Sequence, residues 1–209
     1  MKKIVLVGGG GHCSSVLDSI LKMGEFNPVC ITDYVDIGKE ILGVKVIGDD
    51  SMLDELYNSG ILYAFITVGS VGNPMIRIKI QENLKRIGFK IPSIIDSDAL
   101  ISSNAIIEDG VFVGKGAIVN VSAVIKKNAI INTGAIVEHD CIIGEFVHVA
   151  PGSTVSGGVT IGDNSHIGAG AVVIEGIKVG DNCLIGAGSV IIRDVESNSK
   201  ICGNPGRKI

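Results

Sequence analysis

A six-residue repeat runs through the second half of the sequence and limits the folds available to it. Starting at Ile95, every sixth residue is isoleucine or valine, and no insertion interrupts the phase. The fourth residue after each of these positions is mostly Ala, Ser or Cys. Neither an α-helix nor a flat strand has a period of six, so the pattern indicates a repeat architecture. The seventeen repeated positions are Ile95, Ile101, Ile107, Val113, Val119, Ile125, Ile131, Val137, Ile143, Val149, Val155, Ile161, Ile167, Val173, Val179, Ile185 and Ile191.

This period is typical of a parallel β-helix with triangular coils. Three six-residue units complete one coil, so residues 18 apart in the sequence stack on the same edge. The aliphatic residue fills the interior of a flat side, and the small residue fits inside a corner. The chain contains 29 Gly and no Trp, and only 4% of it is aromatic although 46% is hydrophobic. Such a composition suits a narrow coil interior that has little room for aromatic rings.

The first half of the chain follows a different pattern, in which strand-like and helix-like segments alternate. Such alternation is typical of a small parallel sheet with helices on both faces. Pro92 marks the boundary, so we expect a Rossmann-like α/β domain over residues 1–92 and the β-helix over residues 93–209. Apolar runs indicate strands at 4–7, 29–31, 44–47 and 63–68, and helical spacing indicates helices at 16–21, 53–56 and 75–87.

Charge and hydropathy exclude several classes of partner. The net charge of −4 offers no basic excess for a nucleic-acid backbone, and aromatic residues for stacking on bases are few. No apolar run approaches the roughly 20 residues that cross a bilayer. The apolar run after the initial Met-Lys-Lys is too short for a signal peptide and ends in glycines. Five cysteines without a CxxC pair indicate reduced thiols, so we expect a cytoplasmic protein without nucleic-acid or membrane partners.

Three short motifs accompany the repeat: the glycines at 8–11, the triplet Glu138-His139-Asp140, and the segment CGNPGR at 202–207. Together with the repeat they resemble the bacterial sugar acetyltransferases of the NeuD/PglD type, and the resemblance extends over essentially the whole chain. That family includes sialic acid O-acetyltransferases and nucleotide-amino-sugar N-acetyltransferases. The resemblance implies a left-handed parallel β-helix, acetyl-CoA as co-substrate and a homotrimer.

His139 is the candidate general base for acetyl transfer, since an imidazole titrates near neutral pH. Its place in the repeat is an outward corner, and the adjoining Asp140 can hold the second ring nitrogen. Gly157 stacks one coil later, where its backbone N–H can face a developing oxyanion. His148 lies one flat side away, too far from His139 to share a small ligand. If both contact one acetyl group, they come from different subunits.

The resemblance also implies contacts with the acetyl donor. It assigns His148, Ala169 and Ala187 to acetyl-CoA binding, and the basic residues Lys200, Arg207 and Lys208 in the tail are candidates for the phosphates of CoA. Several histidines admit a zinc site, but His139 and His148 lie on different corners without the ligand spacing of a zinc enzyme, so we expect no metal. Cys141 occupies an inward small position and is expected to pack, and His166 is expected to be structural.

The glycine-rich turn follows the dinucleotide fingerprint only in part, because Cys13 replaces its last glycine. Asp33 ends the second predicted strand, near the place where an acid binds a ribose. A nicotinamide site and a purely structural turn both stay open on this pattern. The resemblance implies instead a nucleotide-sugar site, and the departures at Cys13 and Tyr34 leave its nucleotide open. The residues implied are Gly11, His12, Cys13, Asp33, Tyr34 and Gly69.

The sequence therefore predicts an acetyl-CoA-dependent acetyltransferase that acts on the amino group of a nucleotide-linked amino-sugar. The amine would attack the thioester directly, with His139 as the general base. A sialic acid O-acetyltransferase of the same fold is the nearest alternative, because the sequence does not separate attack by nitrogen from attack by oxygen. The repeat is also compatible with a non-catalytic β-helix scaffold and with a zinc hydratase.

Overall fold

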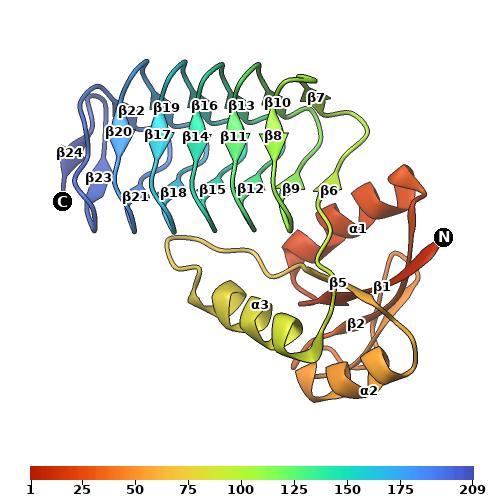
Figure 1. The fold of residues 1–209 in the computed structure, drawn as a ribbon. Coiled ribbons are helices and arrows are strands. Elements are labelled where there is room, and N and C mark those ends of the chain that lie inside the picture. The colour runs from red at the N-terminus through yellow and green to blue at the C-terminus, as the bar shows by residue number, and fades with distance from the viewer. The chain divides into compact units, whose positions relative to one another are not determined.

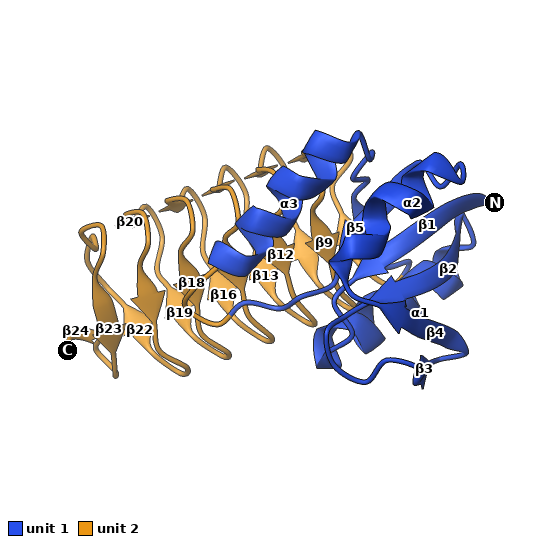
Figure 2. Cartoon of the chain, turned by 90° about the horizontal axis from the view of Figure 1, so that it is seen from below, with its two compact units in different colours: residues 1–70, 75–97 blue, residues 71–74, 98–209 orange.

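The computed structural model describes all 209 residues, and the chain divides into two compact units. Unit 1 comprises residues 1–70 and 75–97, and unit 2 comprises residues 71–74 and 98–209 (Figure 2). The α/β unit followed by a β-helix confirms the fold class predicted from the two sequence patterns.

Unit 1 is built on a five-stranded sheet with the order β3-β4-β2-β1-β5. Its four longer strands are parallel, whereas the short β3, which the sequence did not indicate, pairs antiparallel with β4. The central β1 buries four consecutive aliphatic residues, as a parallel strand covered on both faces does. The strands are β1 (Lys2–Val7), β2 (Phe26–Thr32), β3 (Glu40–Ile41), β4 (Val44–Gly48) and β5 (Tyr63–Ile66).

Helices cover both faces of this sheet (Figure 1). Val5 and Val7 of β1 belong to one buried cluster with residues of α2 and α3. Because side chains alternate along a strand, Ile4 and Leu6 face the opposite side, which α1 covers. The helices are α1 (Gly11–Met23), α2 (Leu53–Asn58) and α3 (Met75–Ile87); the 3₁₀ helix η1 (Asp50–Met52) precedes α2, and β6 (Ile94–Ile95) closes the unit.

Unit 2 is a parallel β-helix in which two-residue strands stack into three sheets (Figure 1). Residues 18 apart pair in register, for example Ile118 with Ile136 and His148 with His166. The first sheet consists of β7 (Leu100–Ile101), β10 (Ile118–Val119), β13 (Ile136–Val137), β16 (Thr154–Val155), β19 (Val172–Val173) and β22 (Val190–Ile191). The second consists of β8 (Ile106–Ile107), β11 (Val124–Ile125), β14 (Ile142–Ile143), β17 (Thr160–Ile161) and β20 (Lys178–Val179). The third includes β9 (Phe112–Val113), β12 (Ile130–Ile131), β15 (His148–Val149), β18 (His166–Ile167), β21 (Leu184–Ile185), β23 (Lys200–Cys202) and β24 (Arg207–Lys208).

The repeated aliphatic position fills the interior of the coils, as predicted. From Val113 to Ile191 every such residue is at most 2% exposed, whereas Ile101 and Ile107 of the first coil are half-buried. Each fully buried Val or Ile side chain contributes about 1.5–3 kcal/mol through the hydrophobic effect. The core of the coils is therefore a continuous column of aliphatic side chains.

One corner residue in each six-residue unit has a left-handed backbone. Every sixth residue from Gly110 to Gly188 has a positive φ; most are Gly or Asn, and Asp140 is the only Asp in this series. Glycine adopts this conformation without strain, and Asn and Asp tolerate it better than other residues. This requirement accounts for many of the chain's glycines and places Asp140 on a sharply turned corner.

Candidate active site

The corner that follows β13 carries an imidazole–carboxylate pair at the surface. His139 Nδ1 lies 2.8 Å from Asp140 Oδ2, and the left-handed backbone of Asp140, with a φ of 59°, belongs to the turn that brings the two side chains together. The pair raises the pKa of His139 above 6.5, mainly through the hydrogen bond to Asp140 and further through the charges of Asp140 and Glu138. With Nδ1 donating to a carboxylate, Nε2 is the nitrogen that can accept a proton.

Glu138 adds a second carboxylate to this corner, a role that the sequence did not reveal. Its Oε2 accepts hydrogen bonds from the backbone N–H of His139 at 3.2 Å and from Asn120 Nδ2 at 3.0 Å. Asn120 occupies the equivalent position one coil earlier, so the spacing of 18 was the signal that could have identified it. These bonds fix the backbone from which the His139 side chain projects.

Gly157 stacks on His139 one coil later, as the spacing predicted. A Cβ atom at Gly157 would lie 2.6 Å from both Nε2 and Cε1 of His139, so only glycine leaves the ring its place. At the equivalent positions of the two earlier coils, the backbone N–H donates to the side chain of the residue just before it: Val121 to Asn120, and His139 to Glu138. The N–H of Gly157 has no such partner in the chain. It is a free hydrogen-bond donor beside the candidate base.

Replacing Asp140 with Asn should shift the acidic limb of the pH profile of kcat/KM to lower pH. A base must be neutral to act, and the Asp140 carboxylate raises the pKa of His139, so wild-type activity rises with pH through a pKa above 6.5. Asn keeps the left-handed corner but removes the negative charge. The measurement is kcat/KM from about pH 5 to pH 9, which reports the pKa of the free enzyme's base. An acidic limb at the same pH in both proteins would contradict the assignment of this pair.

A second group of predicted residues lines a groove of about 410 Å³ along the third sheet. His148, Ala169 and Ala187 all contribute to it. A side chain at Gly168, which also lines the groove, would lie 2.5 Å from the backbone nitrogen of Ala187. Small residues thus keep the floor open over successive coils. Lys200, predicted to meet phosphates, lies at the same groove, whereas Arg207 lines a different pocket of unit 2.

Two stacked imidazoles form part of this groove. His148 Nε2 lies 3.0 Å from Asn132 Nδ2, and the rings of His148 and His166 pack edge to face with centroids 4.9 Å apart. Burial, aided by His148, lowers the pKa of His166 to about 4, so His166 is neutral at physiological pH. His166 therefore lines the groove in addition to packing against the ring of His148. The sequence did not reveal the contact with Asn132. Asn132 and His148 are 16 residues apart, whereas residues that stack in successive coils are 18 apart.

The structure does not bring His139 and His148 to the same face. His139 lies on the corner between β13 of the first sheet and β14 of the second, and His148 lies on β15 of the third sheet. One chain therefore presents the corner with the candidate base and the groove as separate surfaces.

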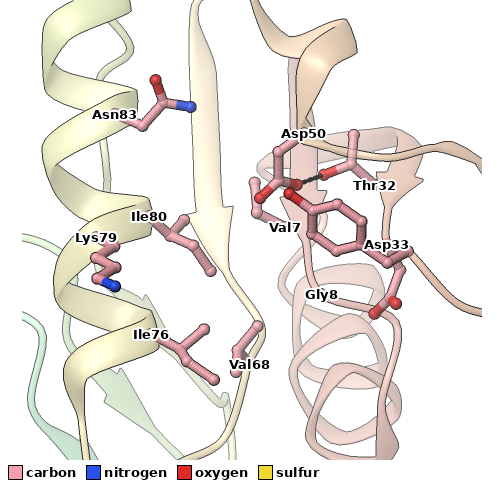
Figure 3. Close-up of a pocket in the computed structure, with 11 residues that line it drawn as sticks. Val7, Gly8, Thr32, Asp33, Asp50, Val68, Ile76, Lys79, Ile80 and Asn83 are labelled. Carbon is pink, nitrogen blue, oxygen red and sulfur yellow. Dashed lines mark hydrogen bonds between the residues drawn. The ribbon is translucent and has the colours of Figure 1, made fainter.

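The third group of residues lies at the carboxyl edge of the sheet in unit 1. Asp33 and Tyr34 line a pocket of about 310 Å³ there (Figure 3). The carboxylate of Asp33 closes the glycine-rich turn, since it accepts the backbone N–H of Gly9 at 2.5 Å and that of Val35 at 2.8 Å. Carboxyl edges of parallel strands are the common ligand sites of such sheets.

The remaining residues predicted for this site divide between the turn and the core. α1 begins at Gly11, and His12 packs beside Gly69, where a Cβ would lie 3.4 Å from the Cβ of His12. Cys13 is fully buried, and burial raises the pKa of its thiol to about 11. Its side chain faces the core and not the pocket.

The same pocket contains polar residues that the sequence analysis did not single out: Thr32, Asp50, Lys79 and Asn83. Asp50 is the second residue after the end of β4, at the same edge of the sheet as Asp33. That shared edge was the signal that could have identified it.

No group of three or more His, Cys, Asp or Glu side chains is arranged to hold a metal ion. None of the helices has the length and apolar character to pass through a membrane.

Family models match both parts of the chain. Residues 3–84 match the PglD N-terminal domain. Residues 122–157 and 158–193 match the bacterial transferase hexapeptide model of six repeats, and residues 104–139 match the hexapeptide repeat of succinyl-transferase.

Solved structures resemble the chain over its full length. PerB from Caulobacter crescentus, in complex with CoA and GDP-perosamine, is 34% identical with a TM-score of 0.94, over 100% of this chain and 98% of that one. A mutant of perosamine N-acetyltransferase from the same organism gives the same identity and TM-score, over 100% of this chain and 97% of that one. The acetyltransferase domain of PglB from Neisseria gonorrhoeae, in complex with acetyl coenzyme A, is 35% identical with a TM-score of 0.91, over 100% and 99%. These matches confirm the resemblance seen in the sequence: the chain belongs to the family of hexapeptide-repeat acetyltransferases that carry a PglD N-terminal domain.

Proposed function

We propose that the protein transfers the acetyl group of acetyl-CoA to the amino group of a nucleotide-linked amino-sugar. The observation that carries the proposal is the corner at His139, where a carboxylate-paired imidazole packs directly against Gly157, whose backbone N–H has no partner in the chain. A base and an oxyanion donor side by side are the two groups that acyl transfer to an amine requires. The similar structures that contain CoA with GDP-perosamine, or acetyl coenzyme A, support the two substrates.

The reaction needs no covalent enzyme intermediate. The amine nitrogen attacks the thioester carbonyl carbon while Nε2 of His139 accepts its proton. The N–H of Gly157 donates to the oxyanion of the tetrahedral intermediate, which collapses with cleavage of the carbon–sulfur bond. The His139 imidazolium then returns its proton to the leaving thiolate. Cys141, the nearest thiol in sequence, is fully buried with a raised pKa, and so it is not a nucleophile here.

The complete site is proposed to form between subunits of a homotrimer. The corner at His139 and the groove at His148 face different sides of one coil, so a neighbouring chain would supply the second surface. Leu100, Ile106 and Ile142 leave aliphatic side chains 65%, 58% and 41% exposed on the first and second sheets. A contact between copies would bury them. The groove along the third sheet would then hold acetyl-CoA, with Ala169 and Ala187 beside the pantetheine arm.

Replacing Ala187 with Leu should raise the KM for acetyl-CoA by about tenfold or more, with a smaller change in kcat. The added side chain occupies the groove and removes binding that is shared by ground state and transition state. Wild-type protein should gain about 2.7 kcal/mol of stability at acetyl-CoA concentrations of 100 times Kd, measured as a thermal shift, and the variant should gain much less.

Lys127→Leu is the matched control for this variant. Lys127 holds the same position in the six-residue repeat but lies on a different corner and is exposed. Its KM and thermal shift should equal those of the wild type. Equal KM values for Ala187→Leu and the wild type would place the donor outside the groove.

A turnover assay tests the proposed function directly. Release of CoA is followed with a thiol reagent while acetyl-CoA is combined with UDP-, GDP- or CMP-linked amino-sugars, or with free sialic acid. We expect turnover with at least one nucleotide-linked amino-sugar and none with its hydroxyl analogue. Turnover of free sialic acid alone would support an O-acetyltransferase in place of our proposal, and no CoA binding at all would support a scaffold.

A further inference from the structure

The pocket in unit 1 presents hydrogen-bond acceptors on one wall and donors on the other. Thr32, Asp33 and Asp50 lie on the sheet side, and Lys79 and Asn83 lie on α3, across the space between them (Figure 3). We propose that this pocket selects a guanine nucleotide and that Asp50 is the residue that reads the base. The inference rests on the proposed function and names the nucleotide that the sugar substrate carries.

Asp33 is unsuited to read a base because the protein already uses both of its oxygens. Oδ2 accepts the N–H of Gly9 and Oδ1 accepts the N–H of Val35. These bonds hold the glycine-rich turn against the end of β2. Asp33 therefore shapes the pocket, and the selective contact falls to another group.

Asp50 has an unused acceptor edge at the pocket. Its Oδ1 accepts the hydroxyl of Thr32 at 2.8 Å, and its Oδ2 accepts no hydrogen bond from the protein. Burial raises the pKa of Asp50, the charges of Asp49 and Asp33 add to the effect, and the hydrogen bond from Thr32 opposes it, so this one bond is what the protein supplies to the ionised carboxylate. Neighbouring N–H groups of a ligand would supply them, because charge-assisted bonds to a carboxylate are strong.

The facing wall on α3 offers donors. Asn83 Oδ1 accepts from Arg86 Nε at 3.3 Å and from an Arg86 terminal nitrogen at 2.9 Å. The amide oxygen is thereby engaged, which leaves the NH₂ group of Asn83 for an acceptor. Lys79, one turn earlier on the same helix, adds an ammonium group to this wall.

Guanine is the common base that matches both walls. It carries two adjacent donors, N1–H and the exocyclic NH₂, and its O6 and N7 form an acceptor edge on the opposite side. In adenine and cytosine an acceptor nitrogen adjoins the amino group, and in uracil carbonyl oxygens flank the single N–H. Each of these three bases would place a lone pair against the Asp50 carboxylate.

Apolar side chains supply the surfaces for the faces of the ring. Val7, Val68, Ile76 and Ile80 line the pocket between the two polar walls (Figure 3). A volume of about 310 Å³ lies at the lower end of the range for small-molecule sites. An apolar slot with a few directed polar groups is the usual composition of a selective site.

The test is calorimetric titration of GDP, UDP, ADP, CDP and xanthosine diphosphate into wild type, Asp50→Asn and Asp49→Asn. Wild type should bind GDP at least tenfold tighter than UDP, ADP or CDP. Asp50→Asn should weaken GDP binding by about 10- to 100-fold. It should also bind xanthosine diphosphate more tightly than wild type does, because an amide accepts from the N1–H of xanthine and donates to its O2. A misfolded variant cannot produce that gain.

Asp49→Asn removes the same charge one residue away and serves as the control. Asp49 caps η1 by accepting the N–H of Ser51, and Asn caps helices equally well, so all affinities should stay within about twofold of wild type. Tighter binding of UDP than GDP by wild type, or equal losses for every nucleotide in Asp50→Asn, would overturn the inference.

A turnover assay distinguishes a failure of this inference from a failure of the proposed function. If UDP-linked amino-sugars are acetylated faster than GDP-linked ones, the inference fails and the proposed function stands. If GDP binding is selective but no nucleotide-linked amino-sugar is acetylated, the proposed function fails and the assignment of the pocket stands.

Discussion

Replacing His139 with alanine should lower kcat by about 10²- to 10⁴-fold. The imidazole is the group at its corner whose ordinary pKa lies nearest neutral pH, and its pairing with Asp140 raises its basicity. The neighbouring Glu138 is committed to the backbone of the corner and to Asn120. The measurement is steady-state CoA release at saturating acetyl-CoA, with the melting temperature recorded in parallel.

Val121→Ala is the matched control for this variant. Val121 is the residue one coil before His139 on the same edge, and its side chain is 40% exposed. Substitutions at exposed positions usually change the free energy of unfolding by less than about 0.5 kcal/mol, so both variants should fold. Val121→Ala should keep the wild-type kcat. A kcat for His139→Ala within threefold of wild type would exclude His139 as the base.

Replacing Gly157 with alanine should lower kcat by about 10²- to 10³-fold, a loss comparable to removing an oxyanion donor. A single Cβ at this position would lie 2.6 Å from Nε2 and Cε1 of His139, closer than atoms can approach, so the ring must move. The backbone of Gly157 does not have a positive φ, so alanine fits its conformation and the fold should survive. Alanine also keeps the backbone N–H.

A double variant isolates the cause of that loss. If Gly157→Ala acts by displacing His139, the combination with His139→Ala should be about as slow as His139→Ala alone. Groups that act as one unit give such non-additive effects. Fully additive losses would show that Gly157 acts independently of His139 and that displacement of the ring is not the cause of the loss.

The β-helix was predictable in detail because its geometry is periodic. A spacing of six residues places an aliphatic residue inside each side, and a spacing of 18 places Gly157 over His139. Contacts that depend on side-chain rotamers do not follow any spacing. The bond between Asn132 and His148 joins residues 16 apart, and nothing in the repeat distinguishes Asn132 from other corner residues.

The α/β unit was predictable in its elements and less so in its pocket. The apolar runs located all four parallel strands, but β3 has only two residues and too little pattern to detect. Asp50 follows another Asp at the start of η1, where acidic residues commonly cap helices. Its position opposite α3 depends on how the helix packs on the sheet. No repeat in this half of the sequence relates Asp50 to α3, so the sequence alone does not predict that the two face each other.

The identity of the bond that forms in the product decides whether the protein is an N-acetyltransferase with His139 as its base. Product from acetyl-CoA and a GDP-linked amino-sugar should be isolated after incubation with wild type and with His139→Ala, and examined by nuclear magnetic resonance. We expect an acetamide on the sugar nitrogen with wild type, together with one CoA thiol released per acetyl group, and a rate lowered at least about 100-fold by the variant. An acetyl ester on a sugar hydroxyl, or an amide formed at an equal rate by the variant, would contradict it.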